Sequence, residues 1–505
     1  MSDSPLALTG AKLTPEAVAQ IARQSRKVAI SPEARERLAA SRAVVERHLE
    51  EDRPVYGLTT GLGQRVTHRL SRDDMAAFSL RTVLGRSVAV GPPLAAEVVR
   101  ALMAVRLNGL LAGGSGAAPE VAETLAAWLN AGLQPIIPGI GSIGAGDLCL
   151  MAHLGLGLIG EGQVQFQGEA MAAAEGLAQA GLEALVLGPK DGLAICNASS
   201  ASARQAALAI ADAESALALA QLAAALSLEG FRGNLSPLDP RMSAARPQPG
   251  QAWAAETLRD LLSGGLLFEP GAARRLQDPI SLRCIAPVHG SLRAVIDFAR
   301  PTVEAELNGA ADNPLVLVED DEILSTGNFQ TPLLALAMDG LAQGLAQVAS
   351  LSLSRSGKLL LERLSGLPAN LSPHGPSRSG YAPLLKAGEA LMAEIRHLAN
   401  PVPVEPRWAA DGVEDDLTNA PLAARKAADA VARLRLLLAM ELAIAVQAVE
   451  LAAPARLGPA VTTAMEAVRE VVPPLDEDRA LSPDIAALDE LLLANGALLE
   501  AVQDG

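Results

Sequence analysis

The chain has few aromatic side chains and few cysteines. Only 2% of its 505 residues are Phe, Trp or Tyr. Nucleic-acid binding needs basic patches, often with interleaved aromatics, whereas the formal net charge here is -16, so no nucleic-acid partner is expected. Three cysteines, each among apolar or small residues, predict free thiols rather than a disulfide framework, and hence a cytoplasmic protein.

Several functional motifs are also missing. The six histidines are scattered without partners at metal-ligand spacing, which makes a metal site unexpected. There is no GxxxxGK[ST] loop and no GxGxxG after a predicted strand, so nucleotide chemistry has no support. The most apolar stretch, residues 436–446, is too short to span a bilayer, and no signal peptide is expected at the start. We therefore expect no membrane partner.

Half of the residues are hydrophobic, mainly Ala, Leu and Val, and this composition favours helices. We predict an all-α fold with long helices over residues 201–229, 287–308, 332–356, 381–399 and 421–453, several of them bounded by Pro or Gly. The expected domains are an N-terminal helix-and-loop region at 1–200, a central long-helix bundle at 201–460 and short C-terminal helices at 461–505. So many apolar helices also suggest an oligomer.

A series of short segments runs through the chain in a fixed order. They are VYGLTTGLG at 55–63, GSIGAGDL at 141–148, DGLAICN at 191–197, QDPISLRC at 277–284, DNPL at 312–315, GNF at 327–329 and VED at 413–415. Together they resemble the histidine/aromatic amino acid ammonia-lyases, which are carbon–nitrogen lyases. The resemblance implies a mostly parallel bundle of long helices in a homotetramer, with active sites shared between subunits.

The second segment departs from this family. There, an Ala-Ser-Gly run inside a segment like GSVGASGDL cyclises into an electrophilic methylidene-imidazolone. Here Ala145 is followed directly by Gly146, and Ser142 matches an earlier serine of the motif. Because the exocyclic methylidene carbon comes from the Cβ of the missing serine, no cofactor is expected.

An elimination without this electrophile needs a substrate whose nitrogen already leaves easily. A quaternary ammonium meets that need, because trimethylamine departs as a neutral molecule. In lacking this serine the chain resembles the ergothionase-like subgroup, which releases trimethylamine from ergothioneine and forms thiourocanate. The expected substrate is a small amino acid or betaine derived from histidine.

The resemblance also implies roles for individual residues. Tyr56 matches the general base that removes the β-proton, and Arg283 matches the arginine that grips the substrate carboxylate. Lys386 and Glu414 would bind and polarise a thioimidazole ring. The alternatives are loop packing for Tyr56, a surface salt bridge for Arg283, a solvated helix face for Lys386 and an acidic loop for Glu414.

Four further positions complete the expected site. Asn197 and Gln277 match substrate-side amides, and Phe329 matches an aromatic wall, with core packing as its alternative. Arg86 stands where histidine-specific members have a histidine. Ile280 and Gln330 likewise replace a tyrosine and a histidine of the family. The groups around the electrophile have thus changed together with it.

Two other hypotheses remain open. The first keeps the methylidene-imidazolone and makes the chain a histidine or aromatic amino acid ammonia-lyase, which requires a serine between Ala145 and Gly146. The second is a catalytically inactive binding or assembly homologue, against which the retained Tyr56, Arg283 and Glu414 argue.

Overall fold

The computed structural model describes residues 4–61, 69–375, 377–403 and 412–494. It is mostly helical, with 61% helix and 7% strand, which confirms the expected fold class. The chain divides into two compact units. Unit 1 comprises Met1–Ala211, Ala299–Met338 and Pro401–Arg425, and unit 2 comprises Asp212–Phe298, Asp339–Asn400 and Lys426–Gly505. The expected division at residues 200 and 460 remains a prediction.

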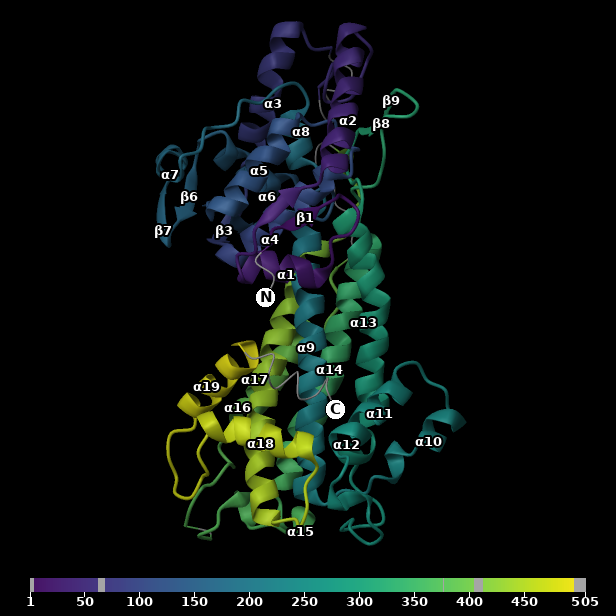
Figure 1. Cartoon of the computed structure of the whole chain (residues 1–505), viewed down its shortest axis with the longest axis vertical. Helices are drawn as coiled ribbons and strands as arrows, with labels where there is room; N and C mark the ends of the chain where they lie inside the picture. The colour runs from purple at the N-terminus through teal and green to yellow at the C-terminus, as the bar shows by residue number, and fades with distance from the viewer. Residues whose placement is uncertain (1–3, 62–68, 376, 404–411, 495–505) are drawn as a thin grey trace. The chain divides into compact units, whose positions relative to one another are not determined.

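Short helices and loops make up most of unit 1 (Figure 1). Thr14, Ser31 and Ser71 each cap a helix by accepting a hydrogen bond from a backbone N–H of its first turn. Helix α4 is buried from Val99 to Leu111 and packs against α1, α2 and α5, whereas α3, α6 and α8 pack against one another. The helices are α1 (Pro15–Arg23), α2 (Pro32–Glu50), α3 (Arg72–Arg86), α4 (Ala96–Leu111), α5 (Pro119–Ala131), α6 (Leu148–Leu158), α7 (Ala173–Ala180) and α8 (Asp191–Cys196).

Small sheets join these helices. Strands β1 (Leu6–Leu8) and β2 (Val28–Ile30) are parallel, with Leu6 opposite Val28. The other pairings are antiparallel, and all strands have at most four residues. They link β3 (Val90–Pro93) with β5 (Pro138–Ile140), β4 (Gln134–Pro135) with β6 (Gln163–Phe166) and β7 (Glu169–Ala172), and β8 (Leu315–Leu317) with β9 (Glu322–Leu324).

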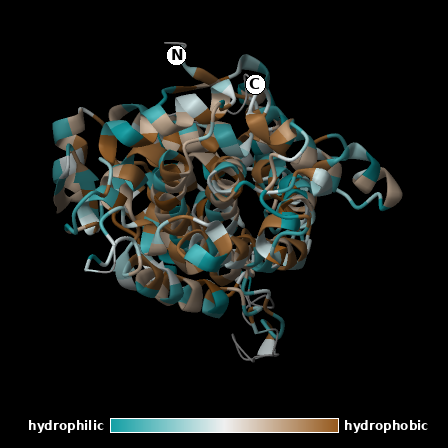
Figure 2. Cartoon of the chain, turned by 90° about the horizontal axis from the view of Figure 1, so that it is seen from below, coloured by the Kyte–Doolittle hydropathy of each residue, from teal (hydrophilic) through white to brown (hydrophobic). Residues whose placement is uncertain are grey.

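Four long helices agree with the sequence prediction. They are α9 (Ser200–Phe231), α13 (Ile285–Asn308), α14 (Pro332–Leu359) and α17 (Ala420–Ala452). Viewed end-on in Figure 2, the central helices carry hydrophobic residues on several sides, as their buried Ala and Leu side chains require. The predicted helix at 381–399 is also confirmed, as α16 (Leu384–Leu398).

Within unit 2 a buried polar group joins three of these helices. Arg355 of α14 donates two hydrogen bonds to the Glu441 carboxylate of α17, at 2.6 and 2.9 Å, and both side chains are fully buried. Ser227 of α9 donates to the same carboxylate at 2.7 Å. The ion pair therefore fixes the register of α9, α14 and α17.

Shorter helices complete unit 2. They are α10 (Pro240–Ala245), α11 (Gln251–Leu261), α12 (Ile280–Arg283), α15 (Glu362–Ser365), α18 (Pro459–Val471) and α19 (Ser482–Ala494).

Two helical stretches of the described chain, Asp191–Phe231 and Pro332–Leu359, are long and apolar enough to cross a membrane. In their most apolar windows 72% and 61% of the residues are buried inside the protein, as in core helices, so this is weak evidence for a span.

Candidate active site

The motif loop, defined here as residues 141–147, leads into α6. Gly144 and Gly146 have φ angles of +83° and +82°, a conformation that favours glycine. The Ser142 hydroxyl donates to the Asp147 carboxylate and accepts from the Gly144 N–H at 3.1 Å. Ser202 donates to Asp147 from its N–H, at 2.7 Å, and from its hydroxyl. Burial raises the pKa of Asp147, and these hydrogen bonds oppose the rise.

Three expected site residues meet at Gly146. A Cβ built on Gly146 would lie 2.5 Å from Asn197 Oδ1 and 3.7 Å from Phe329 Cβ. The neighbouring Ala145 forms an antiparallel bridge with Gln330. The structure therefore brings Ala145, Gly146, Asn197 and Phe329 together.

The Asn197 side chain is held in one orientation. It follows α8, is 7% exposed, and its Nδ2 donates to the Asn313 carbonyl at 2.8 Å. Because the amide nitrogen is occupied in this way, the amide oxygen is the end that faces Gly146.

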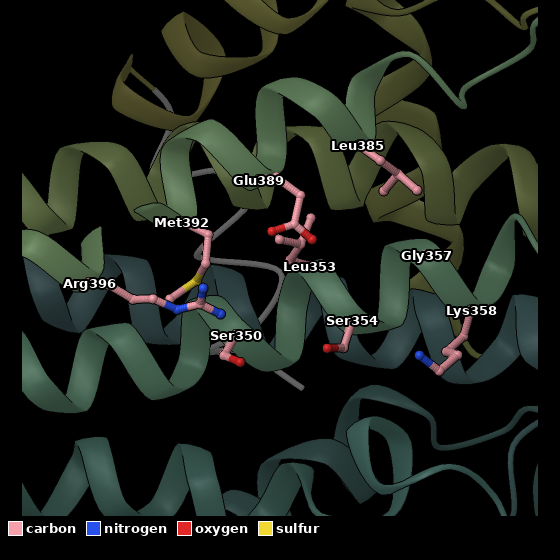
Figure 3. A pocket seen from close by; sticks show the side chains of 9 residues that line it. All are labelled: Ser350, Leu353, Ser354, Gly357, Lys358, Leu385, Glu389, Met392 and Arg396. Atoms are coloured by element: carbon pink, nitrogen blue, oxygen red, sulfur yellow. The ribbon is translucent and has the colours of Figure 1, made fainter. Parts of the chain in front are cut away.

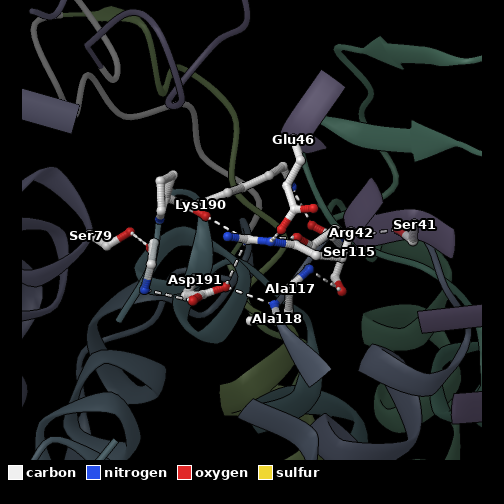
Figure 4. A network of polar contacts seen from close by, with 12 residues as sticks. Ser41, Arg42, Glu46, Ser79, Ser115, Ala117, Ala118, Lys190 and Asp191 are labelled. Atoms are coloured by element: carbon white, nitrogen blue, oxygen red, sulfur yellow. Dashed lines mark hydrogen bonds and ion pairs between the residues drawn. The ribbon is translucent and has the colours of Figure 1, made fainter. Parts of the chain in front are cut away.

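A buried network ties α8 to the segment that contains Asn313. Lys190, at the start of α8, donates to the carbonyls of Ser115 and, at 3.1 Å, Pro314. Arg106 donates to the Ala194 carbonyl and to Asp312 at 2.7 Å. Burial lowers the pKa of Lys190 to about 8, against the opposing charge of Asp312. Figure 4 shows Lys190 beside Ser115, and the adjacent Asp191 with its partners Arg42 and Ala118.

Sequence reasoning did not identify Lys190, Arg106 or Asp312 as parts of the site. The signal was partial: Lys190 directly precedes the DGLAICN segment, and Asp312 opens the DNPL segment. The contacts of Lys190 and Arg106 with backbone carbonyls could not be predicted from the sequence, because every residue type carries such a carbonyl.

The charges of Arg86 and Glu414 both influence the pKa of the Cys149 thiol, which lies in the first turn of α6. Burial raises the pKa of Cys149, the Glu414 charge adds to the rise, and Arg86 opposes it. Burial also raises the pKa of Cys196 to about 12, again against Arg86. Near Glu414, Gln330 donates to Asp416 at 2.8 Å. Arg86 and Glu414 thus lie in the surroundings of the motif loop.

Tyr56 is half-buried in a turn after α2. The turn is anchored by Thr59, whose hydroxyl accepts from the Val55 N–H at 2.7 Å. Val55 and Leu58 pack into a core cluster with Val44, Val45 and Val316. The last two residues of the VYGLTTGLG segment, 62–63, lie outside the described residues.

Gln277 and Arg283 belong to unit 2 and share one segment. Gln277 is exposed, whereas Arg283 is half-buried at the end of α12. Three buried polar atoms in this segment have no hydrogen-bond partner within the described chain: Asp278 Oδ1, Ser281 Oγ and Arg283 Nε. Such atoms cost about 1–3 kcal/mol each when they are left without a hydrogen bond.

Lys386, also in unit 2, lies on the exposed side of α16. The adjacent Leu385 and the nearby Glu389 line a cavity of about 210 Å³ between α16 and α14 (Figure 3). Lys386 itself is not among the lining residues. The expected site residues thus fall into one group in unit 1 and another in unit 2.

The residues of the motif loop do not fit a methylidene-imidazolone. No serine stands between Ala145 and Gly146, and the Ser142 hydroxyl is engaged by Asp147 and Gly144. The contact with Asn197 leaves no room for even a methyl group on Gly146. For a metal ion, no cluster of three or more His, Cys, Asp or Glu side chains occurs in the described part of the chain.

Comparisons with known proteins match this architecture. The family model for aromatic amino acid lyases matches residues 13–470. The histidine ammonia-lyase of Symbiobacterium thermophilum is 41% identical over 495 residues, covering 98% of this chain and 97% of that one.

Solved structures agree. Ergothionase from Treponema denticola, in complex with desmethyl-ergothioneine sulfonic acid, has a TM-score of 0.91 and 32% identity over 97% of this chain and 99% of that one. Histidine ammonia-lyase from Trypanosoma cruzi has a TM-score of 0.93 and 31% identity over 99% and 95%. With most of its length matched at such identities, the chain is a carbon–nitrogen lyase and belongs to the aromatic amino acid lyase family.

Proposed function

We propose that the enzyme eliminates trimethylamine from a betaine of histidine, with ergothioneine as the first candidate and thiourocanate as the product. One observation carries the proposal: Gly146 follows Ala145 directly, with no serine between them, and Asn197 Oδ1 lies close to Gly146. The likeness to ergothionase, a structure solved with a desmethyl-ergothioneine derivative, supports it.

The proposed reaction is a 1,2-elimination. A base removes the proton from Cβ, the C–H electron pair forms the Cα–Cβ double bond, and the C–N bond breaks. Trimethylamine leaves with the electron pair of that bond and needs no covalent activation. The remaining barrier comes from the low acidity of the β-proton. Groups that polarise the thioimidazole ring would make this proton more acidic and so lower the barrier.

We assign the base to Tyr56 and the carboxylate anchor to Arg283. Arg283 suits this role because a planar guanidinium binds a carboxylate with two parallel hydrogen bonds. Its side chain is half-buried at the end of α12, which leaves part of the guanidinium accessible.

Lys386 and Glu414 are assigned to the ring. An acceptor and a cation on opposite sides of a thioimidazole would stabilise the charge that develops at Cβ. Asn197, Gln277, Phe329 and Arg86 line the site in this proposal: the two amides orient the substrate, Phe329 forms a wall, and Arg86 contributes positive charge.

We further propose a cytoplasmic homotetramer whose active sites combine residues of different subunits.

A second candidate is deamination of histidine itself by a methylidene-imidazolone. The curated relatives favour it more directly than they favour the betaine, since those at 37–41% identity are named histidine ammonia-lyases. The sequence of the motif loop opposes it.

One experiment separates the candidates. Purified enzyme is incubated with ergothioneine, hercynine and histidine, while trimethylamine, ammonia and a new conjugated ultraviolet chromophore are followed. Trimethylamine from ergothioneine, with no ammonia from histidine, is the expected result. Ammonia from histidine, together with an intact mass that shows loss of water, would overturn the proposal. If all three substrates stay unchanged, neither the betaine reaction nor histidine deamination stands.

A further inference from the structure

A second cavity, of about 170 Å³, lies beside the motif loop within unit 1. Its polar lining comes from Ser142, Arg204, Gln205, Asn419 and Arg425, and the rest of the lining is mostly apolar. None of the lining residues is Asp or Glu, whereas two are arginines. The cavity therefore carries positive charge and offers no carboxylate to balance it.

Arg204 is a buried cation without a direct ion pair in the described chain. It is 3% exposed, and its Nε and Nη1 donate to the carbonyls of Val98 and Ala201 at 3.2 and 2.7 Å. Its Nη2 donates no hydrogen bond to any described residue. Unlike the enclosed atoms that lack a partner, this nitrogen keeps some accessible surface. This nitrogen is a free donor at the buried side of the cavity.

Asp147 does not neutralise Arg204 by contact. Its charge lies near enough to oppose the fall in the pKa of Arg204 that burial causes. Its two oxygens, however, already accept hydrogen bonds from Ser142 and Ser202. Because a buried charge is costly unless paired, an anion in the cavity would stabilise the folded chain.

Arg425 supplies the second cation. Its side chain is exposed and makes no hydrogen bond or ion pair with the residues that the structure describes. Nearby, Asn419 donates through Nδ2 to the Pro403 carbonyl at 2.8 Å, which holds its side chain in place. The half-buried Gln205 adds a further amide.

We propose that this cavity binds the carboxylate of a small organic acid, between Arg204 on the buried side and Arg425 on the exposed side. The apolar lining fits a short hydrocarbon body. A dry cavity of about 150 Å³ can hold benzene, so the available space admits an acid of about six non-hydrogen atoms.

The position of the cavity connects it to the motif loop. Ser142 lines the cavity and bonds both Asp147 and the Gly144 N–H. A bound carboxylate therefore stabilises the loop that holds Ala145 and Gly146. This binding does not depend on the substrate proposed above.

Isothermal titration of the full chain with propionate, and with propionamide as its neutral match, tests the proposal. Propionate should bind with one ion per chain, and propionamide should not bind. Arg425→Gln and Gln205→Leu should each weaken propionate binding about tenfold, as expected for loss of a hydrogen bond to a charged group. Arg363→Gln, which removes an exposed arginine outside the cavity, should leave it unchanged.

Arg283→Gln distinguishes this cavity from the proposed substrate site. Propionate binding should persist in Arg283→Gln and weaken in Arg425→Gln. The proposal is overturned if propionate does not bind, if propionamide binds equally well, or if Arg283→Gln alone abolishes binding. Unchanged melting temperatures of the variants would show that each is folded.

Discussion

Asn197 Oδ1 lies so close to Gly146 that a Cβ on this glycine would approach it to 2.5 Å. The amide cannot rotate away freely, because its nitrogen donates to the Asn313 carbonyl. Lys190 and Arg106 in turn hold the neighbouring segment from buried positions. The position of one amide oxygen is thus set by contacts that reach through unit 1.

Replacing Gly146 with Ala should therefore destabilise the chain and lower its activity. The positive φ alone costs about 1–2 kcal/mol for a residue with a Cβ. Gly168→Ala is the matched control, since Gly168 has a φ of +88° and nothing within 4 Å of its added methyl group. Urea denaturation should show a larger loss for Gly146→Ala, by at least about 1 kcal/mol for the clash. Equal losses would contradict the close contact.

The long helices were predictable because their signal is local. Runs of Ala and Leu bounded by Pro or Gly placed α9, α13, α14, α16 and α17 to within a few residues of their observed ends. Strands such as β1 and β2 escaped prediction, because three residues are too few to show an alternating pattern and their pairing partner is distant in sequence.

The site was predictable only in part. The ordered segments indicated Asn197, Phe329 and the motif loop, and the structure brings these together. Lys190 was missed because its partners are carbonyl groups 75 and 124 residues away. A buried cation that binds backbone carbonyls leaves no pattern in side-chain types, so only the folded chain reveals it.

Arg355 and Glu441 should stabilise the folded chain only when both are present, because either charge alone would be buried without its partner. Arg355→Met leaves the Glu441 carboxylate buried and uncompensated, which should reduce the free energy of unfolding by about 3–5 kcal/mol. The double variant Arg355→Met with Glu441→Leu should be more stable than Arg355→Met alone. Arg456→Met, which breaks the exposed pair with Glu269, should cost no more than about 1 kcal/mol. A double variant that is less stable than the single one would refute this account.

Glu229 should make the stability of the protein depend on pH. It is 1% exposed, its Oε1 has no partner among the described residues, and burial raises its pKa from 4.5 to about 7. Between these values the unfolded chain is ionised while the folded chain keeps the proton. The stability contributed by this group is therefore present below pH 4.5 and is lost as the pH rises to 7.

Glu229→Gln stays neutral at every pH, so it should match the wild type near pH 4.5 and exceed its stability at pH 8. The shift corresponds to about 3 kcal/mol at 1.36 kcal/mol per pKa unit. Denaturation at both pH values measures the difference, and Glu466→Gln, at an exposed position, controls for the change in net charge. The same gain at both pH values would show that ionisation of Glu229 is not its cause.

The chain contains two tyrosines, and this allows a paired test of the proposed base. Tyr56→Phe removes only the hydroxyl, and loss of a general base typically lowers kcat by about 10²–10⁴-fold. The KM for ergothioneine should change little, because the substitution keeps the aromatic ring. Tyr381→Phe, at a buried position in unit 2, should keep kcat close to that of the wild type. Were Tyr56→Phe to retain full turnover of ergothioneine, another group would have to take the β-proton, and the assignment of Tyr56 would fall while the betaine substrate could stand.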